Sequence, residues 1–170
     1  MNLQPTNLRN DIVWLEPLKQ GHFDELYLVA SDPLIWEQHP NPDRYKLDAF
    51  INYFKGAMES GGAFIIRDAS TGMALGSSRY CSYNAVNKEI QIGYTFLSRN
   101  CWGKSINAEV KKLMLNYAFD YVEKVAFYVG ANNIRSQIAM KRIGGIKVGE
   151  ETVAYFGEPS RLNFRYEICK

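Results

Sequence analysis

A glycine and a lysine stand just before a helical segment, in a setting where phosphate groups are often bound. Residues 98–105 (SRNCWGKS) lie between an alternating, strand-like segment and the longest helical pattern of the chain. Gly103 frees the backbone, Lys104 adds a positive charge, and the following helix offers unpaired N–H groups and the positive end of its dipole. The pattern therefore indicates a phosphate-binding turn, and a plain loop that contains a glycine is the alternative.

The same residues nearly match the P-loop of nucleotide hydrolases, G-x-x-x-x-G-K-[ST]. Ser98 stands where that pattern requires its first glycine. A P-loop also belongs to a parallel sheet, which the order of elements described below does not support. A P-loop-like nucleotide binder therefore stays only as a remote alternative.

The elements that position this turn follow from hydrophobic periodicity. Helical spacing predicts helices over residues 22–31, 47–58, 105–120 and 134–143. Strand-like patterns cover residues 12–15, 63–67, 73–81, 89–96, 125–129, 146–156 and 161–168. This order predicts one α+β domain over residues 1–170, with a mostly antiparallel sheet of six or seven strands and one β-α-β crossover between residues 93 and 129.

Two details of the middle segment bear on a binding site. The apolar residues at positions 90, 92, 94 and 96 are predicted to share one face of a strand, and Gly93 predicts a bulge or the close approach of a ligand. In the next helix, Lys111 and Lys112 are predicted to lie on a solvated face or to help attract phosphate.

The composition excludes several classes of function. Twenty Lys and Arg residues against 18 Asp and Glu give a net charge of +2, which provides no basic excess for nucleic-acid binding. Three widely spaced cysteines argue against a disulfide framework and a metal site. No secretory signal and no apolar run of ~20 residues is found, so we expect a cytoplasmic protein that does not contact membranes.

Three motifs in sequence order resemble the GNAT acyltransferase superfamily. They are residues 89–97 (EIQIGYTFL), residues 100–105 (NCWGKS), and residues 133–136 (NIRS) followed by Gly144 and Gly145. In that family a strand leads into a Q/R-x-x-G-x-G/A loop, and a later helix opens with N-x-x-S and closes near a glycine. The likeness spans residues 14–168 and is greatest to the branch of ribosomal-protein N-terminal acetyltransferases. It implies the GNAT-like α+β fold, a mixed sheet flanked by helices.

The resemblance also implies acetyl-CoA as the acetyl donor and direct transfer to an amine in a ternary complex. The pyrophosphate of the donor would rest on the turn, and its pantetheine arm would pair with the end of the preceding strand like an added strand. The residues implied in donor binding are Tyr94, Thr95, Phe96, Leu97, Asn100, Trp102, Gly103, Lys104, Ser105, Ile106, Asn133 and Ser136. Asn100 and Ser105 depart from the Gln or Arg and the Gly or Ala that the family prefers, and Gly145 replaces its usual Phe.

The same resemblance suggests catalytic residues. Ser136 matches the serine of N-x-x-S and is predicted to lie near the departing sulfur; a hydroxyl that caps the first turn of the helix is the alternative. Glu89 is the predicted base, because related enzymes often carry a carboxylate there, with Glu150 and Glu151 as alternatives. Asn133 is predicted to cap the helix and also to contact the donor.

The acceptor side of the site is predicted from a different part of the chain. Trp36 and His39 lie in a proline-rich loop, and we interpret them as candidates for the acceptor pocket. The pKa of histidine suits proton transfer, but we rank His39 as a pocket residue rather than as the base, with a loop histidine that is hydrogen-bonded to the backbone as the alternative. The acceptor is expected to be a primary amine on a protein N-terminus or a small molecule, and a homodimer is a family-level expectation. A non-catalytic acyl-CoA sensor is the alternative from another class.

Overall fold

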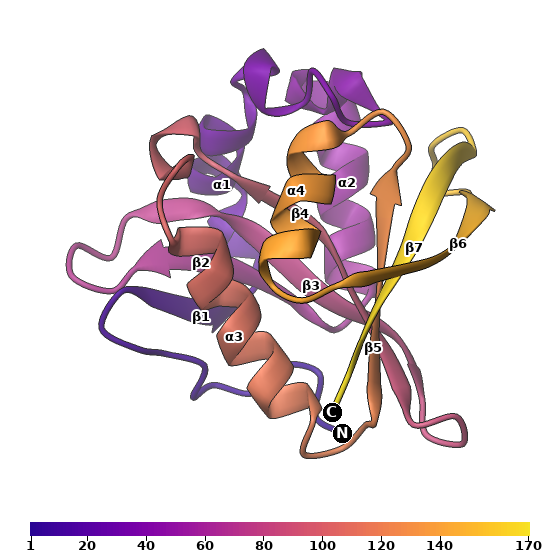
Figure 1. Cartoon of the computed structure of the whole chain (residues 1–170). Helices are drawn as coiled ribbons and strands as arrows, with labels where there is room; N and C mark the ends of the chain where they lie inside the picture. Colours follow the sequence, from indigo (N-terminus) through magenta and orange to yellow (C-terminus); the bar gives the residue numbers. More distant parts are fainter.

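Seven strands form one mixed sheet in the computed structural model, which describes residues 1–170 (Figure 1). They are β1 (Val13–Pro17), β2 (Ala63–Asp68), β3 (Ala74–Asn84), β4 (Glu89–Leu97), β5 (Lys124–Gly130), β6 (Ile146–Val153) and β7 (Arg161–Cys169). Their order in the sheet is β1-β2-β3-β4-β5-β7-β6. Only β4 and β5 run parallel, and every other neighbouring pair is antiparallel. The predicted α+β class and the β-α-β crossover are thereby confirmed.

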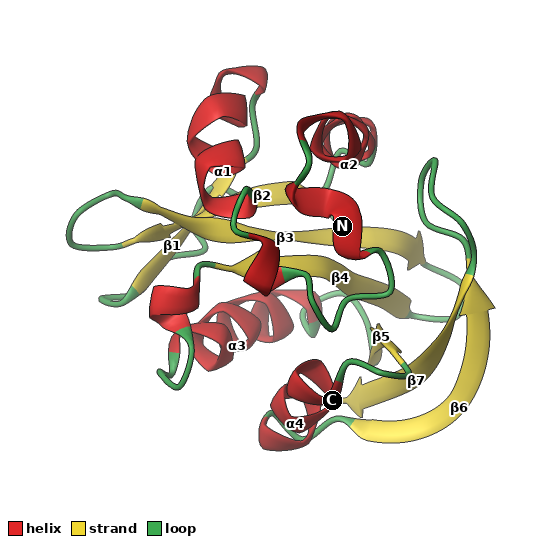
Figure 2. Ribbon diagram, turned by 90° about the horizontal axis from the view of Figure 1, so that it is seen from above, coloured by secondary structure: helices red, strands yellow, loops and turns green.

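Four helices cover the two faces of this sheet. Figure 2 shows α1 (Phe23–Ala30) and α2 (Leu47–Glu59) on one face, and α3 (Ile106–Ala118) and α4 (Ile134–Arg142) on the other. Each face has its own hydrophobic core, which is packed around α3 on one side and around α1 and α2 on the other. The order of strands and helices is the one that the periodicity predicts. None of the helices combines the length and the apolar composition that a membrane-spanning segment requires.

Local sequence signals explain which face of α2 is buried and where α4 begins. In α2, Phe50, Tyr53, Phe54 and Ala57 are buried at the i, i+3, i+4, i+7 spacing of a single helical face. In α4, the side chain of Asn133 accepts a hydrogen bond from the N–H of Ser136 at 3.0 Å. This is the N-cap that the sequence predicts, and it fixes the first turn of α4.

β4 contains the bulge that Gly93 predicts, displaced by one residue. Ser77 and Arg79 of β3 lie opposite Phe96 and Gly93, so an extra residue is accommodated in β4 between them. Tyr94 takes a φ of 53°, a left-handed conformation that costs energy for a residue with a bulky side chain.

The bulge makes one prediction wrong. Ile90 and Ile92 pack in the core around α3, but Phe96 packs in the core around α1 and α2. An extra residue reverses the inward and outward alternation, because side chains of a strand alternate with a period of two. Positions 90 to 96 therefore do not share one face, and Thr95 turns toward α3 instead.

The prediction for Lys111 is also wrong. Lys112 is exposed, but Lys111 is buried and only 3% of its surface is accessible. The buried face of α3 consists of Val110, Lys111, Met114, Leu115 and Ala118. Lys111 thus occupies a position on the core-facing side of the helix.

Candidate active site

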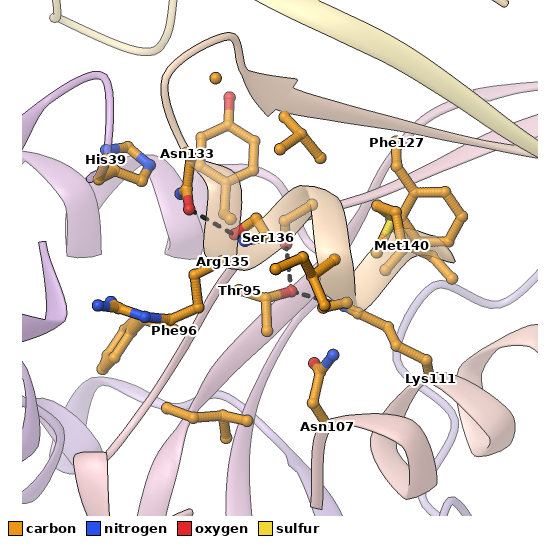
Figure 3. A pocket seen from close by; sticks show the side chains of 18 of the residues that line it. His39, Thr95, Phe96, Asn107, Lys111, Phe127, Asn133, Arg135, Ser136 and Met140 are labelled. Atoms are coloured by element: carbon orange, nitrogen blue, oxygen red, sulfur yellow. Dashed lines mark hydrogen bonds between the residues drawn. The ribbon is translucent and has the colours of Figure 1, made fainter. Parts of the chain in front are cut away.

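A cleft of about 420 Å³ opens where β4 and β5 separate (Figure 3). The two strands share ladder pairs only from Glu89 to Gln91 and from Lys124 to Ala126. Beyond these pairs, β4 stays bound to β3 and β5 stays bound to β7. The cleft is lined by residues 91–97 of β4 and 127–130 of β5, together with parts of α3, α4 and the loop between α1 and α2.

One wall of the cleft is an unpaired strand edge. β4 continues to Leu97 without β5 beside it, so its backbone can pair with an extended molecule that fills the gap. The predicted donor-binding residues Tyr94, Thr95, Phe96 and Leu97 all line the cleft. The structure therefore brings the predicted strand end to the cavity.

The turn after β4 leads to free N–H groups at the start of α3. The backbone N–H groups of Ile106, Asn107 and Ala108 make no hydrogen bond within the chain, and α3 has no side-chain cap. Such groups, at the positive end of a helix dipole, suit a phosphate. Gly103 has a φ of 74°, which a residue with a side chain rarely adopts, and this tight turn places Lys104 at the cleft.

The side chains of the turn are only partly in the cleft. Trp102, Gly103 and Lys104 line it, and the guanidinium carbon of Arg135 lies 3.7 Å from the ring centroid of Trp102. Asn100 is exposed and does not line the cleft. Ser105 and Ile106 do not line it with their side chains either, and Ile106 packs against the core instead.

Ser136 offers a free hydroxyl to the cleft. Its backbone N–H is bound by Asn133, whereas its Oγ has no hydrogen-bond partner in the chain. Ser136 and Asn133 both line the cavity. The hydroxyl is therefore not used as a helix cap, which was the alternative role predicted for Ser136.

Glu89 lies away from the cleft, contrary to the expectation that it is the base. Its carboxylate accepts two hydrogen bonds of 3.0 Å from Arg165 and lies 3.2 Å from Nζ of Lys124. These ion pairs tie β4, β5 and β7 together at the end where the strands are still paired. Glu150 and Glu151 pair with Lys147 and Arg165 and are also outside the cleft. No Asp or Glu lines the cavity at all.

On the α1 and α2 side, the cleft is walled by aromatic rings around a buried arginine. Arg44, only 2% exposed, donates through Nε and Nη2 to the two carboxylate oxygens of Glu158 at 2.7 and 2.6 Å. Its guanidinium carbon lies within 5.8 Å of the ring centroids of Trp36, Tyr53, Tyr94 and Tyr155. This arrangement fixes the wall that an acceptor would meet.

His39 and Trp36 belong to the same wall. His39 Nε2 accepts a hydrogen bond from Nη1 of Arg44 at 3.1 Å, and Nδ1 lies 3.3 Å from the carbonyl oxygen of Asn41. Burial, with the charge of Arg44 beside it, holds the pKa of His39 well below its usual value. His39 is therefore neutral and engaged, which suits a wall residue better than a base. Trp36 is buried and donates from Nε1 to the carbonyl oxygen of Ala30 at 2.7 Å.

Lys111 is the cleft residue that the sequence reasoning placed wrongly. Its Nζ donates to Oγ1 of Thr95 at 2.6 Å and to Oγ of Ser78 at 3.2 Å, and it has no acidic partner. Burial lowers the pKa of Lys111 to about 7. The sequence carries one signal for this position, because Lys111, Leu115 and Ala118 recur at helical spacing on one face. Sequence reasoning also did not select Arg44, Asn107, Arg142 or residues 127–130, which line the cleft as well.

Comparison with known proteins agrees with this geometry. The family model described as an acetyltransferase (GNAT) domain matches residues 13–146, more than half of the chain. A Chromobacterium violaceum structure assigned to the GNAT family has a TM-score of 0.83 at 22% identity and covers 97% of this chain and 87% of that one.

Two further solved structures share the fold at lower identity. The microcin C7 self-immunity acetyltransferase MccE, in complex with acetyl-CoA and AMP, has a TM-score of 0.78 at 16% identity, with 99% of each chain covered. Mycobacterium smegmatis RimJ, in complex with CoA-disulfide, has a TM-score of 0.71 at 14% identity and covers 92% of this chain and 81% of that one.

The Arg44–Glu158 pair gives a stability prediction. Glu158→Gln leaves the buried guanidinium of Arg44 without its counter-charge, so we expect a loss of roughly 3 kcal/mol in the free energy of unfolding. Glu150→Gln, which breaks the exposed pair with Lys147, is the matched control and should cost less than about 0.5 kcal/mol. Urea denaturation of both variants measures the difference, and equal effects would contradict the buried role of the pair.

Lys111 gives a prediction about stability and pH. The folded-state pKa of about 7 lies below the unfolded value of 10.5, so the unfolded chain binds more protons between these two values. The free energy of unfolding of the wild type should therefore rise, relative to Lys111→Met, as the pH increases from 6 to 9. Lys112→Met, at an exposed position, should show no such change. Chemical denaturation at several pH values gives the comparison, and parallel curves for wild type and Lys111→Met would contradict it.

Proposed function

The chain belongs to the GNAT acetyltransferase family, and we propose that it transfers the acetyl group of acetyl-CoA directly to a primary amine, on a protein N-terminus or a small molecule, in a ternary complex. One observation supports this most: the unpaired edge of β4 leads directly, through one turn, to the free N–H groups at the start of α3. A strand edge and a phosphate site in one cleft match the two ends of a pantetheine diphosphate chain.

The residues present fit acetyl-CoA, which is the acetyl donor of this family. The edge formed by Tyr94, Thr95, Phe96 and Leu97 would hold the pantetheine arm, and the N–H groups of residues 106–108 would hold the pyrophosphate. Lys104, Arg135 and Arg142 add positive charge to the lining of the cleft. The donor supplies an activated thioester, so the protein needs neither a metal nor a covalent intermediate for this reaction.

The chain's own groups have three tasks in such a transfer. The acceptor amine must be held in its neutral form, the acetyl oxygen must be stabilised, and the departing sulfur must be stabilised as its bond to the acetyl carbon breaks. The free hydroxyl of Ser136 suits the third task as a hydrogen-bond donor. No Asp or Glu lines the cleft, so it offers no carboxylate base, and we propose that the amine loses its proton to water or reaches the cleft already neutral.

The charges of the cleft also bear on the class of acceptor. The charged side chains in the lining are all cationic, namely Arg44, Lys104, Lys111, Arg135 and Arg142. The acceptor wall carries the rings of Trp36, Tyr94 and Tyr155. A polyamine or an aminoglycoside would bring several positive charges into this cleft without a counter-charge. We therefore propose an acceptor with a single amine on an apolar or aromatic group.

The first test separates donor binding from acetyl transfer. Acetyl-CoA at a hundred times its dissociation constant stabilises by ~2.7 kcal/mol, which for a chain of this length raises Tm by roughly 5–10 °C. Mg-ATP is the control for the nucleotide-binding alternative and should leave Tm unchanged. Release of CoA is then followed with tyramine, a short peptide with a free N-terminus, spermidine and kanamycin.

We expect turnover with tyramine or the peptide to exceed turnover with the two polycations. A rise in Tm with acetyl-CoA but no turnover with any amine would instead favour the non-catalytic sensor. A rise with Mg-ATP alone would contradict the donor site.

Ser136 gives a second prediction for the reaction. Ser136→Ala removes the hydroxyl but keeps the Asn133 cap, because the cap uses the backbone N–H of residue 136. We expect kcat to fall by about 10²-fold with little change in the affinity for acetyl-CoA, since this hydrogen bond matters when the sulfur departs. Isothermal titration and steady-state kinetics measure both quantities. Ser31→Ala, outside the cleft, is the control, and an unchanged kcat in Ser136→Ala would remove Ser136 from the mechanism.

A further inference from the structure

Lys111 is a buried cation without a counter-ion inside a cleft that has no carboxylate. Its side chain is 3% exposed, and its Nζ contacts only the hydroxyl groups of Thr95 and Ser78. A lysine that merely fills space would be replaced at lower cost by methionine or leucine, because burying an unpaired charge is expensive. The position therefore calls for a functional explanation.

Lys111 lies close to the point where β4 and β5 separate, after the ladder pair of Gln91 and Ala126. We call this divergence of the two strands the fork. Thr95 lies within the unpaired edge of β4, and Phe127 is the first residue of β5 beyond the last ladder pair. Lys111 Nζ lies 2.6 Å from Oγ1 of Thr95 and 5.9 Å from the ring centroid of Phe127. Figure 3 shows Lys111 reaching from α3 toward Thr95 in the same cavity as Ser136 and Met140. An extended molecule that pairs with the β4 edge passes this side chain.

Acetyl transfer leaves one proton to be supplied on this side of the cleft. The sulfur of CoA departs with the electron pair of the broken bond and becomes a thiolate, which must be protonated. The hydroxyl of Ser136 can donate a hydrogen bond, but it is a far weaker acid than a thiol and cannot supply the proton. An ordinary lysine, with a pKa near 10.4, is also a weaker acid than a thiol with a pKa near 8.5. Burial reverses this order for Lys111, whose pKa of about 7 makes its ammonium the stronger acid.

We propose that Lys111 is the acid of the acetyl transfer, and that its ammonium donates a proton to the departing sulfur. As the bond between nitrogen and the acetyl carbon forms and the carbon–sulfur bond breaks, the electron pair of the latter passes to sulfur, and sulfur takes the proton from Nζ. The proton released by the attacking amine goes to water, and Lys111 regains a proton from water before the next turnover. This assignment rests on the proposed acetyltransferase function.

The surroundings of Lys111 allow it to hold either protonation state. Ser78 and Thr95 are hydroxyl residues 2.8 Å apart, and each can donate or accept. The other titratable and charged groups on α3 and on the elements packed against it here are Arg79, Tyr80, Cys81 and Tyr83 on β3, Glu89 and Tyr94 on β4, Lys124 and Tyr128 on β5, Arg135, Lys141 and Arg142 on α4, and Glu109, Lys112 and Tyr117 on α3. None of them shifts the pKa of Lys111, whose only cause of change is burial.

A pH profile follows from this role. For an amine with a pKa near 10, the neutral fraction rises with pH, whereas the ammonium fraction of Lys111 falls above about 7. The kcat/KM of the wild type should therefore rise up to about pH 7 and then level off. In Lys111→Met the rate should keep rising through that range, at a level about 10²-fold lower, because the acid is lost. A purely structural lysine would not remove the break in the profile.

The experiment combines this profile with a measurement that needs no substrate. Protein with ¹³C-labelled lysine is titrated by NMR, and the signal absent from Lys111→Met is followed; we expect it to titrate near pH 7 in the free wild type. Turnover of acetyl-CoA with the most active alkylamine of the panel, rather than with the peptide, is then measured from pH 6 to 9, because the expected profile applies to an amine with a pKa near 10. The variants are Lys111→Met, Lys111→Gln and the exposed control Lys112→Met, each with its affinity for acetyl-CoA and its Tm. Lys111→Gln provides a second neutral variant if Lys111→Met does not fold.

The outcomes separate the two proposals. A break near pH 7 that is present in the wild type and Lys112→Met but absent from the Lys111 variants, with donor affinity retained, supports Lys111 as the acid. Turnover and profile unchanged in the Lys111 variants, or a lysine signal that titrates above pH 9, would overturn this assignment and leave the acetyltransferase function standing. Donor binding without turnover in the wild type would instead overturn the proposed function, and the role of Lys111 with it.

Discussion

β4 and β5 run side by side in parallel but share ladder pairs over only three residues each. Beyond Gln91 and Ala126 the two strands follow different neighbours, and the backbone groups on the inner edge of β4 are left for a ligand. The ion pairs of Glu89 with Arg165 and Lys124 hold the closed end of the fork, while α3 and α4 line the open end. The cleft is thus a consequence of where the pairing stops, and Glu89 contributes to it as a structural residue.

The bulge at Tyr94 decides which side chains face each half of this cleft. The hydroxyl of Tyr53 donates to the carbonyl oxygen of Tyr94 at 2.8 Å, and the guanidinium carbon of Arg79 lies 3.8 Å from the centre of its ring. These contacts hold a residue in a left-handed conformation that it would not otherwise favour. Because the bulge reverses the alternation, Tyr94 meets the aromatic wall and Thr95 meets Lys111. The bulge therefore gives β4 its strained residue and also gives Lys111 its hydrogen-bond partner Thr95.

The parts of this molecule that depend on local pattern could be predicted from the sequence, and the parts that depend on distant contacts could not. The helix and strand order, the Asn133 cap and the bulge near Gly93 follow from periodicity, capping chemistry and a glycine in mid-strand. The partner of Glu89 is 76 positions away, so no local pattern reveals that its carboxylate is already paired. Whether Lys111 is buried or exposed depends on the rotation of α3 about its axis relative to the sheet, and that rotation places this charged residue on the buried face. Charge alone predicts the opposite, since unpaired lysines are rarely buried.

The three buried cations near the cleft differ in how well their charges are compensated. Arg44 is satisfied by Glu158 and four rings, so it adds a rigid wall to the acceptor side without an unpaired charge. Arg79 keeps its Nε without a partner, and Lys111 has only hydroxyl groups around it, so both leave part of their desolvation cost uncompensated. A chain selected for stability alone would have paired or removed them. Of the two, only Lys111 lines the cleft, where a thioester bound along the β4 edge would pass it.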